Sequence, residues 1–177
     1  MIVVADTTPI NYLILIEEID VLPKLYGRVI LPRAVSEELM RSRAPVKVQE
    51  WIKQPPAWLE VLSPTGGVDA KLAKLDAGER DAIALAEELS ADQLIVDELL
   101  GRREAERRSL PVIGTIGVLR EAAEMGLLNL RSAFERYLNA CSKPAFMYHR
   151  QFLQACSMTS RRFSPYSSKL FGSRHHP

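Results

Sequence analysis

The chain has 177 residues, of which 47% are hydrophobic and 25% charged, a balance typical of a soluble globular domain. Its net charge of +1 hides an asymmetry, because no acidic residue follows Glu135 whereas seven basic residues do. Two cysteines are too few for a disulfide-rich secreted scaffold, and no apolar run is long enough to cross a bilayer. We therefore expect a cytoplasmic domain over residues 1–141, with no membrane partner, followed by a basic and poorly patterned tail over 142–177.

The N-terminal run predicts a short strand that is buried on both faces. Residues 2–5 are three β-branched residues and an alanine, and the run stops at Asp6. Proline is tolerated in the first turn of a helix, so Pro9 indicates that a helix follows directly. Asp6 then lies at the carboxyl end of a buried strand, where ligands bind in open α/β sheets. A simple helix cap is the alternative role for an aspartate at this position.

Further apolar runs predict more strands that alternate with helices along the chain. Strands are expected over 29–31, 58–62, 94–96 and 111–113. Helices are expected as one or two over 13–25, then over 34–40, 46–52 and 79–89, as an arginine-rich helix after residue 97, and as a final helix over 115–125. Such alternation is typical of an α/β fold. We predict a three-layer α/β/α sandwich with a mainly parallel central sheet of four to five strands.

Acidic residues gather near the carboxyl ends of the predicted strands. Asp6 and Asp97 each follow a strand, Glu38 lies on the helix after the second strand, and Glu79 and Asp81 stand in the first turn of another helix. Carboxylates so close repel one another unless a divalent cation holds them, and Mg²⁺ prefers oxygen ligands. One or two such ions bind phosphate and activate water, which is nuclease chemistry. An ordinary first-turn acid, favoured by the helix dipole, is the alternative for Glu79.

Other α/β chemistries fit the strand ends less well. A receiver domain has adjacent acids after the first strand and a lysine after the last, whereas Thr7 follows Asp6 here and Gly114 follows the last strand. A phosphatase of the haloacid dehalogenase type needs Asp-x-Asp, and Thr8 stands at the second aspartate. A dinucleotide-binding loop needs glycines after the first strand, and none occurs there.

Five segments within about residues 1–130 carry the polar and acidic residues discussed above: Val3–Pro9, Leu31–Leu39, Leu75–Ala86, Leu94–Glu98 and Pro111–Leu119. In this order they resemble the PIN domain, and more narrowly the VapC-like toxins of toxin–antitoxin pairs and an uncharacterised PIN subgroup. It implies a ribonuclease that depends on Mg²⁺ or Mn²⁺ and hydrolyses the RNA backbone in line, leaving a 5′-phosphate and a 3′-hydroxyl.

The resemblance also implies roles for individual residues. Asp6 and Asp97 match acids that hold the metal, and Glu38 matches an acid that completes the site or orients water. The remaining acid is either Glu79 or Asp81, of which Glu79 is preferred. Thr8 and Thr115 match polar positions that orient carboxylates or metal-bound water, and either one or two ions fit this set.

Substrate and partners follow from charge and from the same resemblance. Arg102, Arg103 and Arg107 place positive charge beyond Asp97, where RNA phosphates would bind, although a solvated helix balanced by its own acids explains them equally well. The resemblance implies a small antitoxin as protein partner and a homodimer. The alternatives are a non-catalytic PIN-like module that binds nucleic acid or protein, and a housekeeping RNA-processing nuclease.

Overall fold

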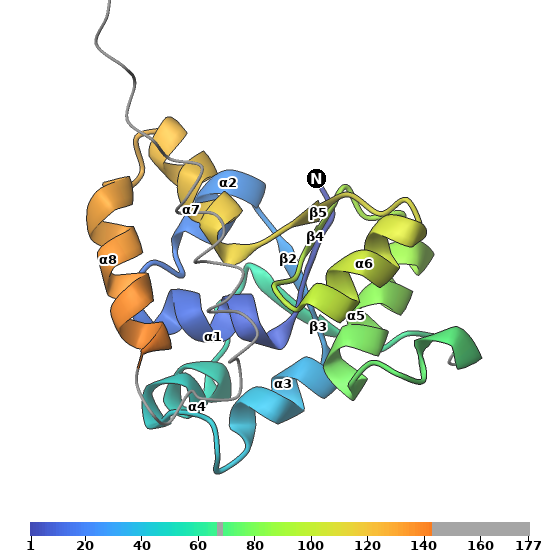
Figure 1. The fold of residues 1–177 in the computed structure, drawn as a ribbon. Coiled ribbons are helices and arrows are strands. Elements are labelled where there is room, and N and C mark those ends of the chain that lie inside the picture. The colour runs from blue at the N-terminus through green and yellow to red at the C-terminus, as the bar shows by residue number, and fades with distance from the viewer. Residues whose placement is uncertain (67–68, 143–177) are drawn as a thin grey trace, which may run out of the picture. The chain divides into compact units, whose positions relative to one another are not determined.

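The computed structural model describes residues 1–66 and 69–142, so the predicted tail lies, apart from Ser142, outside the described residues. Within these residues five parallel strands form one sheet in the order β3-β2-β1-β4-β5 (Figure 1). The strands are β1 (Val3–Ala5), β2 (Val29–Pro32), β3 (Leu59–Leu62), β4 (Gln93–Ile95) and β5 (Val112–Ile113). Each lies on a run that the sequence predicts to be a strand.

Helices fill the connections between the strands. The predicted stretch 13–25 is two helices, the first of which begins directly after Asp6, as Pro9 indicates. No helix among the described residues combines the length and apolar character that a membrane span requires. The helices are α1 (Thr7–Leu15), α2 (Val21–Tyr26), α3 (Arg33–Met40), α4 (Val46–Lys53), α5 (Ala77–Glu88), α6 (Leu99–Arg107), α7 (Thr115–Glu124) and α8 (Leu130–Cys141), with a 3₁₀ turn, η1, at Ala70–Leu72.

The helices cover both faces of the sheet. Helix α5 packs against β1, β2 and β4, and α6 lies beside α5, so these two form one outer layer (Figure 1). Helices α1, α2, α7 and α8 contact one another on the opposite side. Helix α3 contacts both α1 and α5. The predicted three-layer α/β/α sandwich is confirmed.

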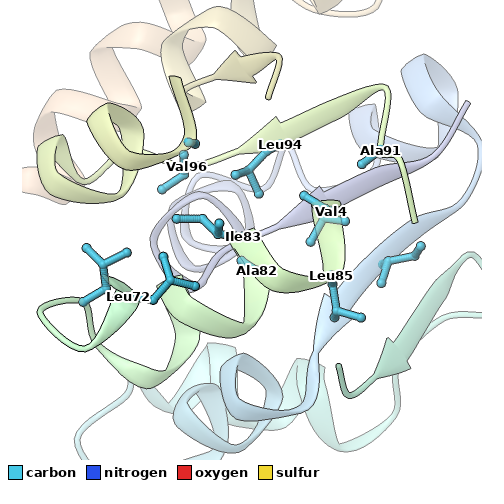
Figure 2. Close-up of a cluster of buried hydrophobic side chains, with 12 residues drawn as sticks. Val4, Leu72, Ala82, Ile83, Leu85, Ala91, Leu94 and Val96 are labelled. Atoms are coloured by element: carbon cyan, nitrogen blue, oxygen red, sulfur yellow. The ribbon is translucent and has the colours of Figure 1, made fainter. Parts of the chain in front are cut away.

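A compact apolar layer fixes α5 against the sheet. Ile83 and Leu85 of α5 lie against Val4 of β1 and Leu94 of β4 (Figure 2), and none of the four side chains is more than 2% exposed. Burying a side chain of this size stabilises a fold by about 1.5–3 kcal/mol. The layer therefore holds the start of α5 in a fixed place beside the ends of β1 and β4.

Helix α8 corrects the expectation that the helix over 115–125 is the last. It begins at Leu130 and is capped by Asn129, whose side chain accepts a hydrogen bond from Ser132 N at 3.0 Å. Its buried residues include Ala133 and Tyr137, and the Tyr137 ring meets Tyr12 edge-on with 5.1 Å between centroids. Small and aromatic residues make this face, so it lacks the aliphatic periodicity that marks the other helices.

The strand order places two predicted site residues side by side. From β1 the chain builds β2 and β3 on one side, and it later adds β4 and β5 on the other. In open parallel sheets ligands bind at the carboxyl ends of the strands where the order reverses, here between β1 and β4. Asp6 follows β1 directly, and Asp97 follows β4 by one intervening residue. Both aspartates therefore belong to this switch point.

Candidate active site

Asp6 is a buried carboxylate with an incomplete set of hydrogen bonds. It occupies the N-cap position of α1 but makes no side-chain capping bond, so a cap does not explain it. The side chain is 3% exposed, and Oδ1 has no hydrogen-bond partner among the described residues. Burial, followed by the negative charges of Asp76, Glu79 and Glu38, raises the pKa of Asp6 well above its usual value, although the backbone of Thr7 offsets part of this.

Glu79 has two roles at the start of α5. Its N–H donates to Asp76 Oδ1 at 2.9 Å and its Oε2 accepts from Asp76 N at 3.3 Å, which is a capping box. Its Oε1 is buried with no hydrogen bond from the described residues, although the backbone of Gly101 approaches and partly lowers the pKa. Burial and the charge of Asp76 nevertheless raise the pKa of Glu79 to about 7. A first-turn cap alone does not account for the buried Oε1.

Asp97 accepts two hydrogen bonds from one residue, Thr115. Thr115 N donates to Oδ1 at 2.8 Å and Thr115 Oγ1 donates to Oδ2 at 2.5 Å, with both residues buried. Because Thr115 is the first residue of α7, the positive end of that helix dipole also favours the anion. Burial raises the pKa of the Cys141 thiol of α8, and the charge of Asp97 also reaches this thiol and adds to the increase. Thr115 thus lies against the acid that it is expected to orient.

Glu38 joins the site through a threonine that the sequence reading did not single out. Thr7 Oγ1 donates to Glu38 Oε2 at 2.9 Å, and Arg43 Nη2 lies 3.3 Å from Oε1. Thr7 Oγ1 and Asp6 Oδ1 both lie 3.3 Å from the position that a Cβ on Gly78 would occupy. The predicted Thr8 is also buried in the first turn of α1, but Thr7 makes the bond to Glu38.

The structure separates the two alternatives for the remaining acid. Successive helical residues point about 100° apart, so Glu79 and Asp81 face nearly opposite directions on α5. Asp81 is half-buried; its pKa is raised by burial and by Glu37, and it is lowered by Arg80. The charge of Glu79, in contrast, raises the pKa of Asp6. Glu79 therefore lies with the acids at the switch point, and Asp81 lies with a different set of charges.

The three arginines expected to bind RNA have different surroundings. Arg102 is half-buried, and its Nη1 donates to Val96 O at 3.0 Å. Arg103 is exposed, and Arg107 donates from Nε and Nη2 to Glu104 at 3.0 and 2.6 Å. The structure thus brings Arg102 to the end of β4, next to Asp97, and pairs Arg107 with an acid of its own helix.

Three glycines allow the backbone to approach the acids closely. An added Cβ would lie 3.3 Å from Asp6 Oδ1 at Gly78, 2.7 Å from Glu79 Oε1 at Gly101, and 2.7 Å from Asp97 Oδ1 at Gly114. Gly78 and Gly114 stand in segments that carry the family resemblance, whereas no sequence signal marked Gly101. Each of these acids therefore lies against a glycine near the start of a helix, and any larger residue at that glycine would push the carboxylate away.

A divalent cation fits the chemistry of these donors. The described residues contain no cluster of three or more His, Cys, Asp or Glu side chains that could hold a metal ion alone. Mg²⁺ requires less, because it is commonly bound by one or two carboxylates, several waters and the substrate phosphates. Asp6 and Glu79 each offer a buried oxygen that lacks a hydrogen bond from the described residues. These all-oxygen donors are the kind that a hard cation prefers.

Comparison with known proteins agrees with this arrangement. Residues 2–158 match a family model described as DUF3368, a PIN domain. No curated protein matches the chain, and no solved structure matches it. PIN domains are generally nucleases, and they typically use divalent metals. From the match over most of its length, the chain belongs to the PIN-domain family.

Proposed function

We propose that the protein is an endoribonuclease that hydrolyses RNA phosphodiester bonds with Mg²⁺ or Mn²⁺. The observation that carries this proposal is Asp6, which lies at the switch point of the sheet as a buried carboxylate. Its pKa is raised by burial and by three neighbouring acids, and its Oδ1 lacks a hydrogen bond from the described residues. A carboxylate in such a place gains stability from a cation, and a catalytic role explains why it is kept there.

Each acid has a separate role in the proposed site. One or two of Asp6, Glu79 and Asp97 would bind the cation directly and the others through water, with Glu38 completing the site or orienting a water. The ion, when bound, neutralises the carboxylates, binds a phosphate oxygen and lowers the pKa of a water. Thr115 donates two hydrogen bonds to Asp97, and Thr7 donates one to Glu38, so both threonines would orient the carboxylates. Asp81 lies outside this set.

Cleavage of RNA tests the proposal directly. A 5′-labelled single-stranded RNA is incubated with Mg²⁺, Mn²⁺ or EDTA and with either the unaltered protein or Asp6→Asn. We expect cleavage only by the unaltered protein with metal, and products that end in a 3′-hydroxyl. Glu124→Gln is the matched control, because Glu124 is exposed and pairs only with Arg120 among the described residues. Equal cleavage by the unaltered protein and Asp6→Asn would remove the nuclease claim for this site.

We further propose that the protein is the toxin of a toxin–antitoxin pair, with a small antitoxin as partner and a homodimeric state. The support is the resemblance of the five segments and the match to a PIN family. Induced expression in bacterial cells should arrest growth for the unaltered protein and not for Asp6→Asn. Cleavage of one defined precursor without growth arrest would instead indicate a housekeeping nuclease. Metal-independent RNA binding without cleavage would indicate a binding module.

A further inference from the structure

We propose that Arg102 is a catalytic residue that binds the phosphate under attack, rather than one of several general contacts to the RNA backbone. The proposal rests on the proposed function, because it assigns a substrate contact to the same site. It depends on where the guanidinium is anchored, on what lies beside it, and on how it differs from the other arginines of α6.

The anchor of Arg102 is a backbone carbonyl at the site itself. Nη1 donates at 3.0 Å to the oxygen of Val96, the residue between β4 and Asp97. A guanidinium carries five N–H donors in a planar fork, so this bond orients the group and leaves other donors for a ligand. None of the ion pairs among the described residues involves Arg102. Its positive charge is therefore held in place without an acidic partner in that part of the chain.

Gly114 keeps the guanidinium and Asp97 together. A Cβ at Gly114 would lie 2.7 Å from Asp97 Oδ1 and 3.1 Å from Arg102 Nη1, so both groups occupy the same small space in front of the glycine. Any phosphate that approaches Asp97 to react must consequently come within reach of Arg102.

Arg107 and Arg108 pair with acids outside the candidate site. Arg107 makes two bonds to Glu104 of its own helix, and Arg108 is bound at 2.6–2.8 Å by Asp69, Glu87 and Glu104. Arg108 thereby connects the end of α6 to α5, and neither residue needs a ligand to account for its charge. Arg103 is exposed, as expected of a solvated helix face.

The starts of two helices lie close to Arg102. Its backbone N donates to Glu98 O near the start of α6, and its Nη1 lies near the start of α7. Helix N-termini carry partial positive charge and disfavour a cation, whereas the nearby Asp97 carboxylate favours it. A second anion that binds between the guanidinium and these helix starts makes the position more favourable, and the phosphate of RNA is that anion.

The chemistry gives such a residue a defined task. Water loses a proton to solvent as its oxygen bonds to phosphorus, the bond from phosphorus to the 3′ oxygen breaks, and the 3′ oxygen takes up a proton from solvent to leave as a hydroxyl. Negative charge on the phosphate oxygens is redistributed in the transition state, and a preorganised cation stabilises it. Arginine suits the task because it stays protonated and binds two phosphate oxygens at once.

The test compares Arg102→Ala and Arg102→Lys with Arg131→Ala, a control on α8 where the exposed Arg131 pairs with Glu135. Turnover and KM are measured with a short single-stranded RNA and Mg²⁺, and the affinity for the same RNA is measured in EDTA. We expect Arg102→Ala to lower kcat by about 100-fold, with less than about threefold change in affinity. Arg102→Lys should retain part of kcat, and Arg131→Ala should change it less than about twofold. Guanidinium ion in solution should partly restore Arg102→Ala and leave Arg131→Ala unchanged.

Two results would overturn the assignment in distinguishable ways. If the unaltered protein cleaves RNA and Arg102→Ala keeps its kcat, the role of Arg102 is wrong while the nuclease stands. If the unaltered protein shows no metal-dependent cleavage, the nuclease and the assignment are both wrong. Should Arg102→Ala fail to fold by circular dichroism, Arg102→Lys decides, because full kcat in that variant would contradict the need for a guanidinium.

Discussion

The two halves of the acidic site differ in how their carboxylates are satisfied. At the end of β4, Asp97 accepts two hydrogen bonds from Thr115, so the protein alone stabilises its charge. At the end of β1, Asp6 and Glu79 each keep a buried oxygen without a hydrogen bond from the described residues, and both pKa values are raised. The comparison teaches that hydrogen bonds from the protein stabilise a negative charge on Asp97, whereas Asp6 and Glu79 require a proton or a cation.

The strongest test of this difference replaces one aspartate in each half. Asp6→Asn and Asp97→Asn should each lower RNA cleavage by about 10³-fold, because both remove a charge from the reacting centre. Their effects on stability should be opposite. In EDTA, Asp6→Asn should raise the free energy of unfolding by about 1 kcal/mol, and Asp97→Asn should lower it by about 1–3 kcal/mol, since an amide can accept only one of the two hydrogen bonds that Thr115 donates and carries no charge to strengthen it. Urea unfolding measures both, and shifts of the same sign would break the comparison.

The next largest effect is a dependence of stability on pH. Below the ordinary pKa of glutamate, Glu79 is protonated in both the folded and unfolded chains. Its folded pKa is raised from 4.5 to about 7, so as the pH rises between these values the unfolded chain ionises first and the folded state loses relative stability. In EDTA, the free energy of unfolding should therefore fall by about 2 kcal/mol from pH 4.5 to 8 through Glu79 alone, less than the full shift because water screens part of it.

Glu79→Gln isolates this contribution. The variant should be less sensitive to pH than the unaltered protein, and at pH 8 in EDTA it should be the more stable of the two. Glu124→Gln, on an exposed face, should keep the original pH profile. Urea unfolding at several pH values gives the measurement. An unchanged profile in Glu79→Gln would mean that the carboxylate is more hydrated than its burial indicates.

A smaller effect should come from the close approach of Gly114. Gly114→Ala would place a methyl group 2.7 Å from Asp97 Oδ1 and should lower RNA cleavage by about tenfold, because a displacement of a few tenths of an ångström misaligns the acid. Gly66→Ala is the matched control, since nothing lies within 4 Å of its added Cβ and cleavage should stay unchanged. Similar cleavage rates in both variants would show that Asp97 tolerates displacement.

The smallest effect is stabilisation by the metal itself. At about five times the dissociation constant, Mg²⁺ should stabilise the folded state by about 1 kcal/mol and raise Tm by about 2–4 °C. The increase should be lost in Asp6→Asn and kept in Glu124→Gln. Differential scanning fluorimetry with and without EDTA measures it. A full increase in Asp6→Asn would place the ion away from the β1 half.

The strands and the acids that follow them could be predicted from the sequence because the pattern there is simple. Apolar runs such as Leu94–Val96 stop at a carboxylate, and parallel strands bring their carboxyl ends to one edge. The core of α5 was equally accessible, since Ala82, Leu85 and Ala86 are spaced i, i+3 and i+4, the spacing of one helix face. Helix α8 was missed because small residues and Tyr137 form its buried face, and these give no aliphatic stripe.

The finer contacts of the site depended on information that the sequence does not display. Thr7, which the sequence did not mark as a site residue, bonds to Glu38, because the rotation of α1 relative to α3 is set by packing. The importance of Gly101 depends on α6 starting against Glu79, two segments that only the fold brings together. The separate surroundings of Arg102 and Arg107 likewise follow from tertiary neighbours rather than from spacing.

The unsatisfied carboxylates of Asp6 and Glu79 have an evolutionary consequence. Most proteins lie only slightly above the stability that they need, so mutations that remove a destabilising group are readily accepted. Neutral replacements at these two positions would raise the free energy of unfolding of the metal-free chain and would not change the apolar layer between α5 and the sheet. A lineage released from selection for cleavage would therefore drift towards inactive descendants that keep the same architecture. Such descendants could serve as binding proteins, and the first mark of that change would be an amide or an alanine after β1.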